Sequence, residues 1–314
     1  MVESTKVAYV FPGQGSQWVG MGRDLYYGFD SARAVFNTAD ETLGFSLSKL
    51  CFNGPEEELR QTENAQPAIV TVSLACLSAI RDISINGLPA PVFVAGHSLG
   101  EYTALAAIGV LGFGTTIYLS CQRGRLMHQA ALKEPGGMAA IIGLSQFELA
   151  KICAETGTQI ANINCPGQLV VSGAKYNLSQ AIALAEARGA YRAILLPVSG
   201  AFHTPLMQPA VDGMAEILGN ISFNKPLIPI IGNITAQPIA TAESVKTELL
   251  GQLCHGVLWQ RSIEYMIDKG VTTFIEIGPG KVLSGLIRRI NGNVKTLSIG
   301  DIEDIKNIET IYRE

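Results

Sequence analysis

Three short apolar runs predict the strands of a buried sheet. They cover 7–11, 91–95 and 272–277, and a turn rich in glycine stops each of them. Runs this short and this uniformly apolar are typical of strands covered on both faces, as in a parallel sheet. Because a helical pattern follows the second and third turns, the chain is predicted to have an α/β fold with a mostly parallel sheet.

The middle of the chain has a different pattern. Its apolar and polar positions predict, in order, a strand at 137–144, a helix at 146–156, strands at 159–164 and 168–173, a helix at 177–188 and a strand at 191–198. The order βαββαβ is that of a ferredoxin-like unit. We therefore predict a smaller ferredoxin-like domain at 134–197, inserted into a larger domain formed by 1–133 and 198–314.

A serine lies on the glycine turn after the second apolar run. Gly96-His97-Ser98-Leu99-Gly100 fits the pattern G-x-S-x-G between a predicted strand and a predicted helix. The glycines allow a sharp turn that exposes the serine hydroxyl at the carboxyl end of the sheet. The amino end of the next helix favours developing negative charge. Ser98 is therefore predicted to be a nucleophile on an α/β-hydrolase-like larger domain, the alternative interpretation being a plain tight turn.

A nucleophilic serine needs a base, and the chain has four histidines: His97, His128, His203 and His255. His97 adjoins the serine on the turn, so its side chain should point elsewhere. His128 falls on the wrong face of its helix, and His255 is explained by a solvent-facing loop. His203 lies where a predicted strand ends and a helix begins, a place where α/β sheets collect catalytic groups. We predict that His203 is the base.

Arg123 lies on the apolar face of the helix predicted at 115–132, whereas Arg125 falls on its polar face. A guanidinium keeps its charge and is rarely buried without a partner. The partner is either a carboxylate of the protein or a carboxylate of a ligand. An internal ion pair, or a side chain that reaches out to water, explains Arg123 equally well from periodicity alone.

Composition excludes several other classes of protein. Hydrophobic residues make up 47% and charged residues 16% of the 314 positions, and the net charge is −4. Disorder is excluded by the high apolar fraction, and nucleic-acid binding by the absence of any run of Lys or Arg. The six cysteines are far apart, and none has a spacing to histidine that suits zinc. With neither a signal-peptide pattern nor a stretch of about 20 apolar residues, we expect a cytoplasmic protein without a metal or a membrane span.

Several segments, spread along nearly the full chain, together resemble one family. The chain is similar to the malonyl-CoA:acyl-carrier-protein transacylases of type II fatty acid synthesis, and to the acyltransferase domains of polyketide synthases. The matching segments are F-P-G-Q-G-S-Q (11–17), A-Q-P-A (65–68), G-H-S-L-G-E-Y (96–102), Q-R-G-R-L-M (122–127), G-M-A-A-I-I-G-L (137–144), N-C-P-G-Q-L-V-V-S-G (164–173), V-S-G-A-F-H (198–203) and E-I-G-P-G-K-V-L (276–283).

The resemblance implies a role for each main residue of the site. Ser98 would carry the acyl group as an ester, and His203 would act first as general base and then as acid. Arg123 would hold the malonyl carboxylate through a bidentate pair. Gln14 and the backbone N–H of Leu99 would form the oxyanion hole.

The resemblance implies supporting roles as well. Gln252 would orient the histidine through its backbone carbonyl, so its side chain is expected to be a poor target for mutation. Gln66 would lie near the active site. Asn162 and Asn164 would belong to the polar segment of the small domain that faces the cleft. Phe202, directly before the histidine, would crowd an α-methyl group and favour malonyl over methylmalonyl substrates.

The resemblance also implies the partners, which would be malonyl-CoA and acyl carrier protein. The CoA thioester and the phosphopantetheine arm are substrates, so no cofactor is expected, and the enzyme would be a monomer. Carrier proteins are acidic, so a basic patch is expected at Lys281, Arg288, Arg289 and Lys295, although a solvated helix face explains these residues equally well. The choice between fatty acid and polyketide synthesis stays open.

Two alternatives have other functions. A serine hydrolase, such as a thioesterase or esterase, shares the glycine turn but normally has an acid between serine and histidine. The acids between Ser98 and His203 are all glutamates, at 101, 134, 148, 155 and 186, and most of them belong to predicted helices. A non-catalytic binding module would be expected to lack Ser98, His203 or Arg123, whereas all three are present.

Overall fold

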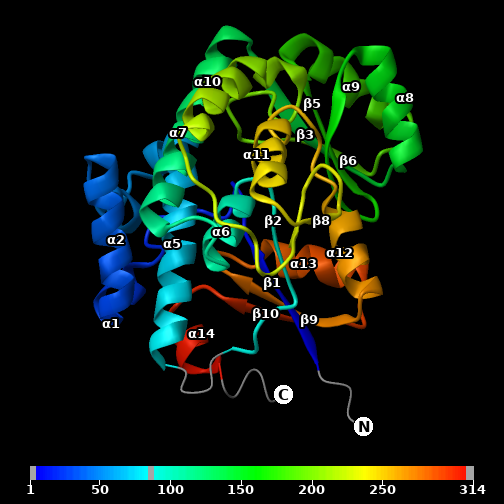
Figure 1. The fold of residues 1–314 in the computed structure, drawn as a ribbon. Coiled ribbons are helices and arrows are strands. Elements are labelled where there is room, and N and C mark those ends of the chain that lie inside the picture. Colours follow the sequence, from blue (N-terminus) through cyan, green and yellow to red (C-terminus); the bar gives the residue numbers. More distant parts are fainter. Residues whose placement is uncertain (1–4, 84–87, 309–314) are drawn as a thin grey trace.

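A mostly parallel sheet forms the centre of the computed structural model, which describes residues 5–83 and 88–308 (Figure 1). Its strands, in the order β10-β9-β1-β2-β7-β8, are paired in parallel except for β7 with β8. This arrangement confirms the predicted α/β fold. The strands are β1 (Lys6–Phe11), β2 (Phe93–Gly96), β7 (Ile230–Ile231), β8 (Pro238–Ile239), β9 (Val271–Ile277) and β10 (Lys295–Ile299).

The register brings the carboxyl ends of the central strands together. Phe11 of β1 pairs with Gly96 of β2, and Ala95 pairs with Ile231 of β7. The loops that follow these three strands therefore begin at one edge of the sheet. This edge is the place where open α/β sheets build their sites.

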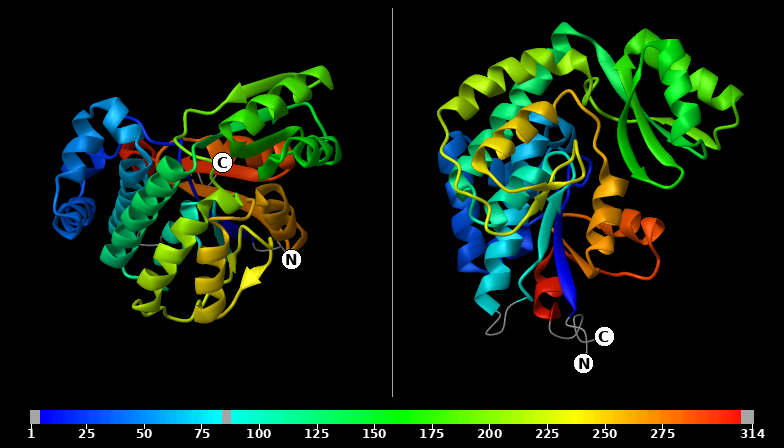
Figure 2. Two further views of the ribbon diagram at one scale, coloured as in Figure 1. Left: turned by 90° about the horizontal axis from the view of Figure 1, so that it is seen from above. Right: turned by 45° about the vertical axis from the view of Figure 1, so that its right-hand side comes forward.

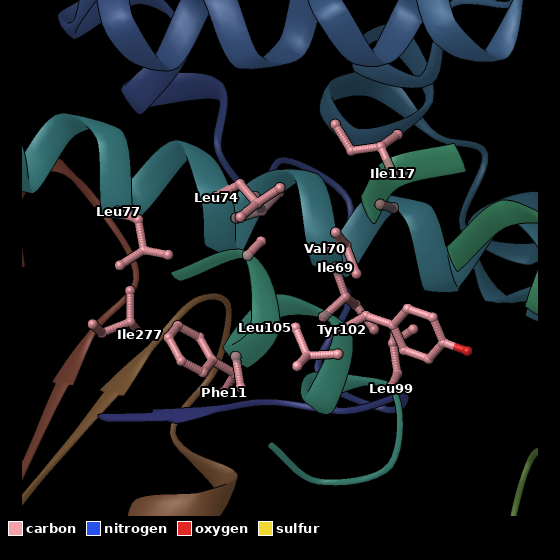
Figure 3. Packing of buried hydrophobic residues seen from close by; sticks show 14 of the residues in the cluster. Phe11, Ile69, Val70, Leu74, Leu77, Leu99, Tyr102, Leu105, Ile117 and Ile277 are labelled. Carbon is pink, nitrogen blue, oxygen red and sulfur yellow. The ribbon is translucent and has the colours of Figure 1, made fainter. Parts of the chain in front are cut away.

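Helices cover both faces of the central sheet, as the apolar strands predicted. Alternate residues of β1 point to opposite faces: Val7 and Phe11 pack in the core beneath α5 (Thr62–Ile83), whereas Ala8 and Val10 pack with the helices of the other face. Figure 3 shows Phe11 and Ile277 of the sheet against Leu74 and Leu77 of α5. The first face also carries α2 (Asp30–Leu43), α6 (Gly100–Ala107) and α7 (Phe113–Lys133), and the second carries α12 (Trp259–Asp268) and α13 (Val282–Ile290).

A second, smaller sheet is antiparallel throughout, with the strand order β4-β5-β3-β6. This order, with the sequence βαββαβ, confirms the ferredoxin-like unit, and the domain boundaries at 133/134 and 197/198 stay a prediction. Its elements are β3 (Gly136–Ile142), α8 (Gln146–Thr156), β4 (Gln159–Cys165), β5 (Gln168–Ala174), α9 (Lys175–Ala187) and β6 (Arg192–Leu195).

One predicted strand is shorter than its pattern suggested. The apolar pattern runs from 191 to 198, but β6 ends at Leu195. Pro197 lies two residues later and has no N–H to donate to a ladder, so the strand stops before it.

The small sheet lies between its own helices and the large domain (Figure 2). In β3, Ala139 and Ile141 pack with α8 and α9, whereas Met138 and Ala140 belong to the core of the large domain. The N–H of Ile163 in β4 donates to the carbonyl of Val257 at 2.9 Å, which ties the small sheet to the segment before α12. The small domain therefore contacts the large domain in two places, through β3 and through β4.

The remaining helices pack around the large domain. These helices are α1 (Arg23–Gly28), α3 (Leu47–Asn53), α4 (Glu56–Arg60), the 3-10 helix η1 (Pro205–Met207), α10 (Gln208–Gly219), α11 (Ala242–Gly251) and α14 (Ile302–Lys306).

Among the described residues, no helix is long and apolar enough to cross a membrane.

Candidate active site

Ser98 lies on a sharp turn between β2 and α6, with a left-handed φ of 51°. A Cβ at Gly96 would overlap the backbone of Gly100, and a Cβ at Gly100 would overlap the carbonyl oxygen of Phe11. Only glycine fits either position, so the two glycines let the turn lie directly against β1. The turn leaves the half-buried Ser98 at the N-terminus of α6.

His203 meets Ser98 across the carboxyl edge of the sheet. Its Nε2 lies 2.9 Å from Ser98 Oγ, and its Nδ1 lies 2.6 Å from the carbonyl oxygen of Gln252. Because a carbonyl only accepts, the ring proton sits on Nδ1 and the lone pair of Nε2 faces the serine hydroxyl. Burial, helped by the nearby charge of Arg123, lowers the pKa of His203 to about 3. The imidazole is therefore neutral at physiological pH and able to take a proton.

Ser98 and His203 share an unusual backbone conformation. Among the described non-glycine residues, positive φ occurs at Ser98, at His203 with 61°, and at Ala236. Such residues are strained and persist only where the surrounding structure holds them, as happens at functional sites. Two of the three thus belong to one hydrogen-bonded pair.

Arg123 comes to the same place from α7, and its side chain is almost fully buried. Its Nη2 donates to Ser98 Oγ at 3.0 Å and to Gln252 Oε1 at 2.7 Å, while its Nη1 donates to Gln66 Oε1 at 2.7 Å. Within the described residues no carboxylate forms an ion pair with Arg123, and its Nε has no hydrogen-bond partner. The protein therefore holds this cation with neutral oxygens and with the ring of Tyr102, whose centroid lies 5.8 Å from the guanidinium carbon. Arg125 is exposed, as predicted.

The side chain of Gln252 corrects one expectation. The resemblance implied a role for its backbone carbonyl only, but the side chain is also fully buried and in contact with the site. Its Oε1 accepts from Arg123, and its Nε2 donates to the carbonyl of Ser98 at 3.2 Å and to a carboxylate oxygen of Glu101. We therefore predict, against the earlier expectation, that Gln252 is also sensitive to mutation through its side chain.

Asn233 was missed by the sequence analysis. It follows β7 by two residues, and its Oδ1 accepts from the N–H of Ser98 at 2.6 Å while its Nδ2 donates to the carbonyl of Gly96 at 2.7 Å. The signal that could have found it is a polar residue directly after a strand of the parallel sheet. That strand is only Ile230–Ile231, too short to stand out in the sequence.

No acid completes a serine–histidine–acid triad within the described residues. The Nδ1 partner of His203 is the carbonyl of Gln252, and Glu101 contacts Asn233 and Gln252 instead of the imidazole. A hydrolase of the usual kind would place a carboxylate at this position.

The predicted oxyanion hole stays a prediction. The side chain of Gln14 donates to Thr62 Oγ1 at 3.1 Å, so its amide is engaged with α5. The N–H of Leu99 lies at the start of α6 and makes no hydrogen bond to another described residue. The backbone N–H groups of the two residues are thus the donors to consider for a developing oxyanion.

A cavity of about 230 Å³ opens between the two domains, beside Gln14 and His97, and its lining does not include Ser98, His203 or Arg123. Gln14 and His97 line it from the large domain, and Asn162 and Asn164 line it from β4 of the small domain. His97 Nε2 lies 2.9 Å from Asn164 Oδ1, so the imidazole next to the nucleophile points to the small domain, as expected. Phe202 is buried in the main core and its effect on selectivity stays a prediction.

The predicted carrier patch stays a prediction as well. Lys281, Arg288 and Arg289 are exposed at or on α13, whereas Lys295 is half-buried. Arg289 donates to Gln168, which also lines the interdomain cavity.

The fold and the site together define a class: α/β proteins with a hydrogen-bonded serine–histidine pair at the carboxyl edge of a mostly parallel sheet. The family model described as an acyl transferase domain matches residues 8–304. The chain belongs to this acyl transferase family and, within it, to the malonyl-CoA:acyl-carrier-protein transacylases, because it is 44% identical to the "Malonyl CoA-acyl carrier protein transacylase" of Bacillus subtilis, over 99% of this chain and 98% of the relative. The family predicted from the resemblance is confirmed.

Other relatives agree with this assignment. The transacylase of the same name from Staphylococcus aureus is 40% identical over 96% of this chain and 98% of its own. The crystal structure of an acyl-carrier-protein S-malonyltransferase from Bartonella henselae has a TM-score of 0.94 at 40% identity, and the match covers 99% of this chain and all of that one. A malonyl-transacylase in complex with a type II polyketide acyl carrier protein has a TM-score of 0.93 at 37% identity, and the match covers 99% of this chain and 100% of that chain.

Proposed function

We propose that this enzyme moves a malonyl group from malonyl-CoA to the phosphopantetheine thiol of acyl carrier protein, through an ester on Ser98. The observation that carries the proposal is the guanidinium of Arg123, buried 3.0 Å from Ser98 Oγ, with hydrogen bonds only to neutral oxygens of the described residues. A buried cation without a carboxylate partner is costly. The free carboxylate of a malonyl group would supply the missing charge at the point where the acyl group is attached.

The first half of the reaction loads the enzyme. His203 Nε2 takes the proton of Ser98 Oγ, and the oxygen attacks the thioester carbonyl of malonyl-CoA. The N–H groups of Leu99 and Gln14 hold the negative charge that develops on the carbonyl oxygen. The carbon–sulfur bond then breaks, CoA leaves as a thiol with the proton from His203, and the malonyl group stays on Ser98 as an ester.

The second half repeats these steps with the carrier. The phosphopantetheine thiol gives its proton to His203 Nε2 and attacks the ester carbonyl, and Ser98 leaves with that proton. The carbonyl of Gln252, 2.6 Å from Nδ1, keeps the ring in the tautomer that both halves need. Ping-pong kinetics follow from this order of events.

Arg123 has two donors for the substrate carboxylate. Its Nε lacks a partner within the described residues, and its Nη2 donates to Ser98 Oγ before the serine is acylated. Gln66 accepts from Nη1, and Gln252 accepts from the same Nη2 that donates to Ser98. The pair of donors is thus fixed in direction before the substrate arrives, which lowers the entropic cost of binding.

Replacement of Arg123 tests the proposal directly. We expect Arg123→Ala to lower kcat/KM for malonyl transfer by about 100-fold or more, the usual cost of removing one partner of a buried charged pair. Acetyl transfer should be spared or raised, because acetyl has no carboxylate to bind. The assay measures labelled acyl transfer from malonyl-CoA and acetyl-CoA to a carrier protein.

The matched control is Arg125→Ala, which removes an exposed arginine from the same helix and should change neither rate. Equal losses of malonyl and acetyl transfer in Arg123→Ala would contradict the carboxylate clamp.

Hydrolysis is the competing activity on this fold. The carbonyl partner of His203 and the family both favour transfer, and incubation of the enzyme with malonyl-CoA without an acceptor separates the two. A transferase should give a stable malonyl adduct on Ser98, visible by intact mass, whereas rapid release of free malonate would indicate a hydrolase. Absence of any adduct would indicate a binding module.

A further inference from the structure

Two glutamates lie buried behind the active site and touch neither Ser98 Oγ nor His203. Glu101, in the first turn of α6, is 1% exposed, and Glu248, in α11, is 6% exposed. Burial raises the pKa of both carboxyl groups, and the nearby charge of Glu248 helps to raise that of Glu101 well above its ordinary value. Two buried carboxyl groups this close are not both charged, because like charges repel.

The surrounding donors all point at Glu101. Glu101 Oε1 accepts from the backbone N–H and from Nδ2 of Asn233, both at 2.6 Å, and Glu101 Oε2 accepts from Gln252 Nε2. Glu101 is thus the acceptor at the centre of this network. Glu248 accepts elsewhere, through its Oε1, from the N–H of Ile234 at 2.8 Å.

Asn233 connects Glu101 to the nucleophile. Its side-chain oxygen accepts from the N–H of Ser98, and its side-chain nitrogen donates to the carbonyl of Gly96. The amide thus holds the strained turn at two points, one before and one after His97. Glu101 fixes which end of that amide is oxygen and which is nitrogen, because it accepts from the same Nδ2.

Gln252 connects Glu101 to the base and to the guanidinium. The backbone carbonyl of Gln252 holds His203 Nδ1, and its Oε1 accepts from Arg123. Because Nε2 donates to Glu101, the amide oxygen is turned to Arg123. A reversed amide would place an NH2 group against the guanidinium and lose that bond.

We propose that Glu101 is a positioning residue that aligns the nucleophile and the base together, holding Ser98 through Asn233 and holding His203 and Arg123 through Gln252. Its role depends on the proposed function of Ser98 and His203. Glu101 acts in place of a triad acid, but indirectly: its carboxyl group orients the imidazole through Gln252, whose backbone carbonyl contacts the ring.

Glu101→Gln tests this role at nearly constant volume. In either orientation the new amide places an NH2 group against Gln252 Nε2 or against the donors of Asn233, so one of the two connections breaks. The control is Glu248→Gln, equally isosteric and also buried, in which the amide oxygen still accepts from the N–H of Ile234.

The measurement is the rate at which a fluorophosphonate labels Ser98 between pH 5 and pH 9, together with kcat and KM for malonyl transfer and the melting temperature. For Glu101→Gln we expect labelling and kcat to fall between about 10- and 100-fold, as a small misplacement of reacting groups does, with KM unchanged. Glu248→Gln should stay within about twofold of the natural protein in both rates.

Two results would overturn the role of Glu101. One is a Glu101→Gln enzyme that is labelled at the natural rate. The other is an equal slowing in Glu101→Gln and Glu248→Gln with equal losses of melting temperature, which would mean that the pair only supports the fold.

A second variant covers the case in which Glu101→Gln does not fold. Asn233→Ala cuts the connection to Ser98 alone, and we expect labelling to slow about 10-fold or more while the pH dependence set by His203 is kept. Unchanged labelling would overturn the connection. Labelling does not need malonyl-CoA, so a natural enzyme that is labelled but transfers no malonyl group would count against the proposed function and leave the role of Glu101 standing.

Discussion

The two sheets of this enzyme contribute to the site in different ways. The large parallel sheet is covered by helices on both faces and brings the loops after β1, β2 and β7 to one edge, where Ser98 meets its partners. The small antiparallel sheet offers amide side chains at the rim of the cavity, Asn162 and Asn164. Parallel strands all end at the same edge, so they can assemble a reactive centre from distant segments, whereas the antiparallel sheet serves here as a wall.

The largest expected effect is the loss of malonyl transfer when Ser98, after β2 of the large sheet, is replaced, compared with Ser172 of the small sheet. Ser98→Ala should lower malonyl transfer by about 10⁴-fold or more, because no other group can carry the ester. Ser172→Ala, in β5, removes a buried hydroxyl that donates to the carbonyl of Gly137 at 3.3 Å, and it should leave transfer unchanged. Transfer assays and intact mass after exposure to malonyl-CoA check both. An acyl adduct on the Ser98→Ala protein would contradict the proposal that Ser98 carries the ester.

Replacing a glycine in a turn should also destabilise the two domains by different amounts. Gly96→Ala forces a methyl group into the backbone of Gly100, so we expect a loss of several kcal/mol in the free energy of unfolding. Gly167, between β4 and β5, has a φ of 72° but open space around its Cα, so Gly167→Ala should cost only about 1 kcal/mol for the left-handed conformation. Denaturant unfolding measures both, and similar losses would contradict the close contact assigned to the turn of Ser98.

Acid should weaken the large domain through His203, whereas 134–197 contains no histidine. The pKa of His203 is about 3 in the folded protein, below the value of about 6.5 expected when it is unfolded. The unfolded chain therefore binds a proton that the folded one does not as pH falls from about 6.5 to 3. The free energy of unfolding should drop by up to about 1.4 kcal/mol per pH unit in this window.

The His203→Gln variant provides the comparison for this effect. In this variant the free energy of unfolding should not show the drop that His203 causes as pH falls. An identical pH dependence of unfolding in the two proteins would mean that His203 is not the group responsible. In the natural protein, labelling of Ser98 should show no acid limb near pH 6.5, because the imidazole is neutral there.

The smallest expected effect comes from replacing Asn164, on the side of the cavity that the small sheet forms. Asn164→Ala removes the acceptor of His97 and one amide from the cavity. A neutral hydrogen bond contributes about 1 kcal/mol, so KM for malonyl-CoA should rise about fivefold. Labelling of Ser98 by a fluorophosphonate should stay at its natural rate. A large drop in labelling would show that the small domain also positions the nucleophile.

Much of the fold was predictable because its signals are local. The apolar runs before glycine turns predicted β1, β2 and β9, and the order of elements from 137 to 198 predicted the ferredoxin-like unit. Ser98 stood out because a strand, a glycine turn and a helix surround it within a few residues. Arg123 stood out because one charge interrupts an apolar helix face.

Local sequence patterns could not predict the contacts that these residues make with distant parts of the chain. Asn233 follows a two-residue strand, and its bond to Ser98 joins positions 135 residues apart. Gln252 was known only for its backbone, because nothing near it in the chain indicates that its side chain reaches Arg123, 129 residues away. Glu101 was considered as a possible triad acid, and only its neighbours in space reveal that it binds two amides instead.

The sequence by itself determined β1, β2 and β9, the inserted unit and Ser98 as the candidate nucleophile, because hydrophobic periodicity and turn residues act over a few positions. Only the tertiary structure decided which polar side chains share the buried space behind Ser98 and which way each amide faces. Burial removes water as a hydrogen-bond partner, so each of these groups must find its partner in another segment. Those segments meet only when the parallel strands align their carboxyl ends.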